Sequence, residues 1–125
     1  MGDTVGDCSA LLTEMDAFRQ GFGQPAQLTD ALRSALLLIP LTDSDRMPTS
    51  TFGGVNWVCA FTSEQEYARY VLARGEQGET CRFHTVFGWR LLDFLVPTVP
   101  GPTGVVIDVA GAAPMAFPPA VDGVA

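Results

Sequence analysis

The chain has 125 residues, of which 47% are hydrophobic and 17% are charged, and its formal net charge is −7. This length suits one folded domain with its own core, and the low share of charged residues argues against a wholly disordered chain. The acidic balance disfavours a nucleic-acid-binding face, which needs clustered cations to neutralise phosphates. The longest apolar run, 35–41, is too short for the roughly 20 residues of a membrane-spanning helix, so no membrane insertion is expected.

Two helices are predicted in the first third of the chain. Residues 1–7 are small and acidic, and we expect them to form a frayed leader. Apolar residues then recur at helical spacing over 8–20, and the glycine-containing stretch 21–23 ends this helix. A second helix begins near Pro25, because proline is favoured in the first turn, and continues to Ala35.

The next segments predict two strands separated by a long connection. Residues 36–41 are apolar, and Pro40 restricts the residue before it to an extended conformation, which favours a strand. The polar stretch 42–54 is long for a connection in a compact domain, so we expect it to be mobile or to serve a function. Residues 55–62 are apolar on both faces, which is typical of a strand inside a covered sheet and places Trp57 in the core.

A helix is predicted directly after this strand. Ser63 and Glu66 have the spacing of a capping box, in which the serine caps the first turn and the glutamate stands three residues later. Glu64 and Glu66 also lie at the positive end of the helix dipole. Capping therefore explains both carboxylates without a catalytic role, and Gly75 ends the helix.

The last third of the chain predicts two strands, a short helix and a tail. The alternation over 80–87 is typical of a half-exposed strand near a sheet edge. Residues 89–96 predict an apolar helix that the following proline ends. Residues 103–109 form a Val/Ile-rich strand, and the Pro/Ala-rich tail 110–125 includes a short strand around 115–117.

Strands that alternate with helices favour an α/β or α+β layered domain. We therefore expect a mixed β-sheet of four to five strands covered by helices, in a single domain that spans 1–125.

Four segments carry a resemblance to a known family, and they follow one another in this order: ALLLIPL (35–41), VCAFTSE (58–64), WRLLDFL (89–95) and TGVVID (103–108). Together they resemble the N-terminal domain of the SseB family over about residues 25–120, with the AFTS-E turn as the most specific element. Family members usually carry Asn-Pro where this chain has Asp108 and Val109. The resemblance implies a small α/β-type domain of the bacterial cytoplasm, without agreed catalytic residues.

The sequence offers no converging set of residues for catalysis. His84 is the single histidine, and Cys81 lies three positions before it, so in a strand the two side chains point to opposite faces and cannot form a nucleophile–base pair. The three cysteines lack a CxxC pair and are expected to be thiols in a reducing cytoplasm. Asp43 and Asp45 lack the further oxygen ligands of a metal-binding loop. We therefore expect no catalytic residues, no metal and no cofactor.

The preferred hypothesis is a non-catalytic interaction or regulatory module. Its helix at 89–96 is apolar almost all round, so something must cover it. Trp89 and Phe94 with the adjacent Arg90 are residue types that anchor protein interfaces, and we expect them to contact a protein partner or a second copy of the chain.

Two alternatives use other features of the sequence. A small ligand-binding domain or enzyme would have its pocket between the 42–54 connection and the strand ends, with Asp43, Asp45, Arg46 and His84 as its polar groups. An acidic immunity-type protein would use the net negative charge to neutralise a basic partner.

Overall fold

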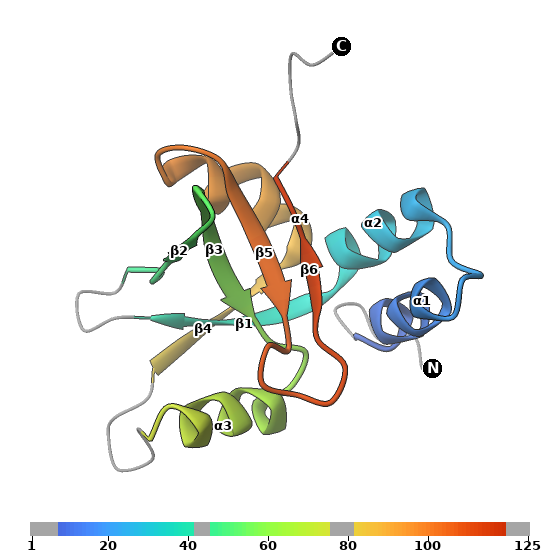
Figure 1. Cartoon of the computed structure of the whole chain (residues 1–125), viewed down its shortest axis with the longest axis horizontal. Helices are drawn as coiled ribbons and strands as arrows, with labels where there is room; N and C mark the ends of the chain where they lie inside the picture. The colour runs from blue at the N-terminus through green and yellow to red at the C-terminus, as the bar shows by residue number, and fades with distance from the viewer. Residues whose placement is uncertain (1–7, 42–45, 76–81, 120–125) are drawn as a thin grey trace.

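A computed structural model of the chain describes residues 8–41, 46–75 and 82–119 (Figure 1). The elements follow in the order α1 (Ser9–Arg19), α2 (Pro25–Ser34), β1 (Leu36–Leu41), β2 (Ser50–Phe52), β3 (Val55–Ala60), α3 (Glu64–Ala73), β4 (Arg82–Phe87), α4 (Gly88–Arg90), η1 (Leu91–Leu95), η2 (Val96–Thr98), β5 (Thr103–Ile107) and β6 (Met115–Phe117). The predicted mixed α/β class is confirmed.

The six strands are divided between two sheets. One has the order β2-β3-β5-β6, with β3 and β5 parallel and the other neighbours antiparallel. The other is the antiparallel pair β1-β4, and a single bridge between Leu38 and Phe61 connects the two sheets. β2 pairs with the first half of β3, and the bridge to β1 lies at Phe61, just past the end of β3. The strands therefore do not continue into one sheet.

The described residues form two buried hydrophobic clusters. The smaller one lies between β1, the end of β3 and α3, and consists of Leu38, Phe61, Tyr67 and Val71. The larger one is the main core between the helices and the two sheets. Its fully buried side chains come from α1, α2, β1, β3, β5 and η1, and the largest are Leu11, Met15, Leu32, Leu37, Ile39, Val58, Leu91, Val105 and Ile107. Apolar side chains from elements this far apart in the sequence are buried together, which supplies the main driving force for folding.

The predicted start of α2 and the serine cap of α3 are confirmed, whereas the other half of the predicted capping box is not: Glu66 Oε1 is buried and has no hydrogen-bond partner among the described residues. Pro25 is the first residue of α2, where its missing N–H costs nothing. At the start of α3, the Ser63 hydroxyl accepts a hydrogen bond from the Glu66 backbone N–H at 3.1 Å. The strand predicted near a sheet edge is β4, which pairs only with β1, and its first four residues are exposed.

The long connection 42–54 contains a strand that the sequence analysis did not predict. β2 and β3 form a hairpin whose two turn residues, Gly53 and Gly54, have φ angles of 63° and 82°. Two consecutive positive φ angles define the type I′ turn, whose twist matches that of paired strands and which favours glycine. The second half of the predicted loop is therefore ordered by backbone pairing.

The prediction that Trp57 belongs to the core is wrong. In β3, Val58 and Ala60 face the core, so Trp57 and Cys59 face the other side of the sheet, where they are only partly buried. The indole ring of Trp57 instead covers Gly104 on the neighbouring strand, so closely that a Cβ on Gly104 would lie 2.6 Å from the ring. α3 covers this second face only at the end of β3, where Cys59 packs against the cluster around Phe61, so Trp57 at the start of the strand stays partly exposed.

Candidate functional site

The candidate interaction residues lie on the helical segment that starts at Gly88. The Gly88 N–H donates to the Ala35 carbonyl oxygen at 2.8 Å, which fixes this segment against the end of α2. A Cβ at position 88 would overlap the Leu32 carbonyl oxygen, so the close approach requires glycine.

A helical segment covers 89–96, as the sequence predicts, but its geometry changes along its length. α4 is α-helical, η1 is a π-helical turn and η2 is a 3-10 turn. The Val96 N–H bonds to the Leu91 carbonyl oxygen, five residues before it, which is the hydrogen bond of a π-helical turn. The next residue, Pro97, has no N–H and cannot donate the hydrogen bond that would continue an α-helix. Pro97 also lies inside η2 and does not end the helical segment.

The π-helical turn brings Trp89 and Phe94 together. On a regular α-helix, residues five apart point about 140° away from each other. Here the two rings form an edge-to-face contact, with centroids 6.0 Å apart and planes at 75°. Trp89 is 38% exposed and Phe94 60% exposed, whereas Leu91 on the inner side of the segment is fully buried. Trp89, Phe94 and the exposed Arg90 form what we call the aromatic patch.

An ion pair holds the helical segment against α2. The Arg33 guanidinium donates two parallel hydrogen bonds to the Asp93 carboxylate, Nη1 to Oδ1 at 2.9 Å and Nη2 to Oδ2 at 2.8 Å. The hydrogen bonds from Arg33 lower the pKa of Asp93 below its ordinary value of 3.8, and the same contact raises the pKa of Arg33. The pair fixes the orientation of η1, because a bidentate contact restricts both side chains.

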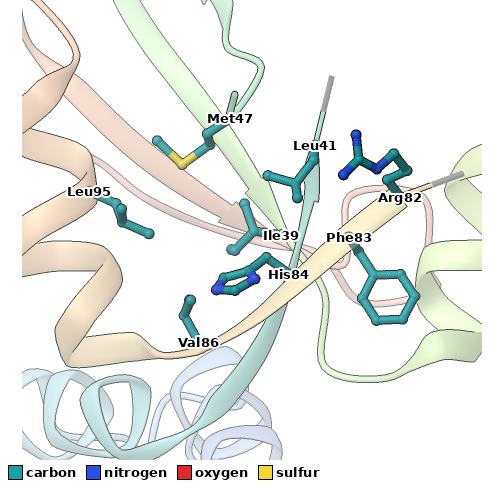
Figure 2. A pocket seen from close by; sticks show the side chains of 8 residues that line it. All are labelled: Ile39, Leu41, Met47, Arg82, Phe83, His84, Val86 and Leu95. Atoms are coloured by element: carbon teal, nitrogen blue, oxygen red, sulfur yellow. The ribbon is translucent and has the colours of Figure 1, made fainter. Parts of the chain in front are cut away.

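A hollow of about 760 Å³, which we call the cleft, opens on one face of the β1-β4 sheet (Figure 2). It is lined by Ile39, Leu41, Met47, Arg82, Phe83, His84, Val86 and Leu95. Ile39 and His84 are direct cross-strand partners, so the predicted site residue His84 stands beside an aliphatic side chain of the cleft. The ring of Phe83 points away from the cleft in Figure 2 and packs edge to face on Tyr67, with centroids 5.5 Å apart.

Arg46 lines a second hollow of about 470 Å³ that shares Met47 and Leu95 with the cleft. Two of the predicted ligand-site residues, Arg46 and His84, therefore lie at adjoining hollows. The other two, Asp43 and Asp45, lie outside the described residues.

The sequence analysis missed the role of Asp108. This side chain is 5% exposed, and its carboxylate accepts hydrogen bonds from the Thr62 N–H at 2.9 Å and the Thr62 hydroxyl at 2.8 Å. Asp108 has a φ angle of 52°, in a region that aspartate tolerates better than most residues. Thr62 and Asp108 follow the ends of the parallel strands β3 and β5, so their contact locks the turn into α3. The sequence shows an Asp directly after a Val/Ile-rich strand, but nothing local in it points to Thr62 as the partner.

Cys59 does not provide a reactive nucleophile. Burial raises the pKa of its thiol above the ordinary value of 9.0, more than the nearby Arg74 lowers it. The thiol is therefore protonated near neutral pH, and the thiolate is the reactive form. Cys81 lies outside the described residues, so its placement relative to His84 stays a prediction.

No protein-family profile, curated protein or solved structure matches the chain. Over 8–41, 46–75 and 82–119, no helix has the length and apolar content to cross a bilayer. The same ranges contain no cluster of three or more His, Cys, Asp or Glu side chains placed to hold a metal ion. The resemblance to the SseB N-terminal domain therefore remains a prediction.

Proposed function

We propose that this protein is a non-catalytic, SseB-type interaction module of the bacterial cytoplasm that binds a second copy of itself through the aromatic patch. The observation that carries this proposal is the fixed, exposed pair of rings at Trp89 and Phe94, which are 38% and 60% exposed. Rigid aromatic side chains lose little conformational freedom on binding and are enriched among the residues that dominate interface energies.

A second copy is the favoured partner because the patch is complementary to itself. In a two-fold symmetric dimer, the same surface of both chains meets. Arg90 lies next to Trp89 in sequence, so the patch offers both a cation and an aromatic face, which attract each other. Two copies related by a two-fold axis can therefore place each Arg90 against the partner's aromatic rings.

The net charge of the chain should make the strength of the dimer depend on the salt concentration. Each copy has a formal charge of −7, so two copies repel each other at long range. Added salt screens this repulsion but has little effect on apolar contacts. We therefore expect the dimer to strengthen when the salt concentration is raised from low to physiological values, the opposite of an interface held by attraction between unlike net charges.

Sedimentation velocity over a range of protein concentrations tests the proposal. The wild-type chain is expected to shift from monomer to dimer as concentration rises. The double variant Trp89→Ala/Phe94→Ala is expected to raise the dimer dissociation constant at least about tenfold, because both ring contacts are lost.

The matched control is Phe52→Ala, which removes another exposed aromatic ring, 80% exposed, from the β2–β3 hairpin. This variant should dimerise as the wild type does, and circular dichroism should give all three proteins the same folded signal. A wild-type chain that stays monomeric throughout, or equal dissociation constants for the double variant and the wild type, would contradict the proposal.

A further inference from the structure

We propose that the cleft on the β1-β4 sheet binds a small organic carboxylate with an apolar body, such as a medium-chain fatty acid. This site is separate from the aromatic patch, and it assigns a ligand class to the hollow in Figure 2.

The cleft has an aliphatic surface for the body of such a ligand. Ile39 and Leu41 of β1, Val86 of β4 and Leu95 of η1 line it, and Met47 lies on its rim. Its volume of about 760 Å³ is within the usual range of about 300–1,000 Å³ for small-molecule sites. Met47 and Leu95 adapt to a hydrocarbon chain without loss of a polar contact, because neither side chain carries a hydrogen-bonding N–H or O–H.

The polar groups of the cleft favour a negatively charged head. Arg82 and His84 line the cleft and Arg46 lines the adjoining hollow, whereas no Asp or Glu occurs among the described lining residues of either. Arg82 and His84 are two residues apart on β4 and both line the cleft, so the cleft has a guanidinium and an imidazole that can donate hydrogen bonds to a ligand. A carboxylate suits these donors, because its oxygens accept the charge-assisted hydrogen bonds that a guanidinium gives.

The register of the β1-β4 pair places the basic and aliphatic groups next to each other. His84 is paired with Ile39, and Arg82 is paired with Leu41. A ligand that places its carboxylate at β4 can therefore extend its hydrocarbon chain over β1 toward Leu95. Arg82 can contribute while it serves a neighbouring group, because a guanidinium presents five N–H donors.

The proposed binding is tested by an NMR titration of ¹⁵N-labelled wild-type protein with octanoate, and with octanamide as the neutral control of equal chain length. Octanoate is expected to shift the backbone signals of β1, β4 and η1 and to saturate. Octanamide is expected to bind at least about fivefold more weakly, because a charge-assisted hydrogen bond is stronger than a neutral one. Equal affinity for the two compounds, or no shifts with octanoate up to its solubility limit, would overturn the proposal.

Three variants locate the site. Met47→Trp places an indole on the rim and should abolish the octanoate shifts, and His84→Ala should weaken binding about fivefold through loss of a polar contact. Arg90→Ala removes an exposed cation outside the cleft and should bind octanoate as the wild type does. Octanoate binding that Met47→Trp leaves unchanged, or that Arg90→Ala alone weakens, would place the ligand elsewhere and contradict the proposal.

Octanoate binding to the cleft does not depend on the self-association proposed above. The Trp89→Ala/Phe94→Ala variant keeps every residue of the cleft and should bind octanoate with wild-type affinity, whatever its oligomeric state.

Discussion

The helical segment from Gly88 to Thr98 borders two surfaces that differ in shape and chemistry. Trp89 and Phe94 project from it as two exposed aromatic rings in contact with each other. Leu95 of the same segment lines a hollow with aliphatic and basic side chains from β1 and β4. Exposed aromatic rings are residue types that anchor contacts with another protein, whereas a hollow with a few polar groups suits a small molecule. One short irregular helix thus borders both of the surfaces for which we propose binding.

The difference between the inner and outer sides of this segment gives the largest expected effect. Leu91 is fully buried and Phe94 is 60% exposed, three residues later. Leu91→Ala should lower the free energy of unfolding by about 2–5 kcal/mol, because it removes buried methyl groups and leaves a cavity. Phe94→Ala should lower it by less than about 1 kcal/mol, since most of that ring already contacts solvent.

Urea denaturation of the monomer, at a protein concentration far below the dimer dissociation constant, measures both values. If Phe94→Ala destabilised the monomer as much as Leu91→Ala, then Phe94 would be a core residue, and the contrast between the two sides of the segment would be wrong.

A smaller effect is expected at the ion pair that fixes η1 against α2. Arg33 lowers the pKa of Asp93 in the folded chain below 3.8, the ordinary pKa of this carboxyl group. The stabilisation by the ion pair is therefore fully present at pH values above 3.8. It is lost as the pH falls from 3.8 through the lowered pKa, where the folded carboxylate takes up a proton. Asp93→Asn should therefore lower the melting temperature slightly at neutral pH, and this difference should shrink as the solution becomes acidic.

Thermal melts of the wild type and of Asp93→Asn across a pH series measure the difference directly. Asp16→Asn is the control, because Asp16 is an exposed acidic residue of α1 away from this ion pair. A difference for Asp93→Asn that is the same at neutral and acidic pH would show that the charge of Asp93 does not contribute.

The fold class and several elements could be predicted because local signals determine them. Pro25 starts α2 through its fixed φ angle, and Ser63 caps α3 through a contact only three residues long. Pro40 identifies β1 as a strand because it restricts the residue before it. The sequence also names Trp89 and Phe94 as candidate interaction residues; the structure shows that both are exposed, and their role stays a prediction.

The features that the sequence did not predict depend mostly on contacts between segments that are distant in the chain. The sequence does not show that α3 covers the far side of β3 at Cys59 and Phe61 but leaves Trp57 partly exposed, so Trp57 was placed in the core. The contact of Asp108 with Thr62 joins residues that are 46 positions apart, and no local pattern encodes it. The Gly53-Gly54 turn was different: two glycines between apolar residues are a hairpin signal, and the sequence analysis passed over it.

The central claim, that the aromatic patch meets the same patch on a second copy, is tested most directly by isotope-filtered NOE spectroscopy. An equal mixture of ¹³C-labelled and unlabelled chains reports only proximities between copies. The account predicts intermolecular NOEs from the Trp89 and Phe94 rings to the same patch of the other chain, at a concentration where sedimentation detects dimer. Intermolecular NOEs confined to another surface, such as the open face around Trp57, would contradict it.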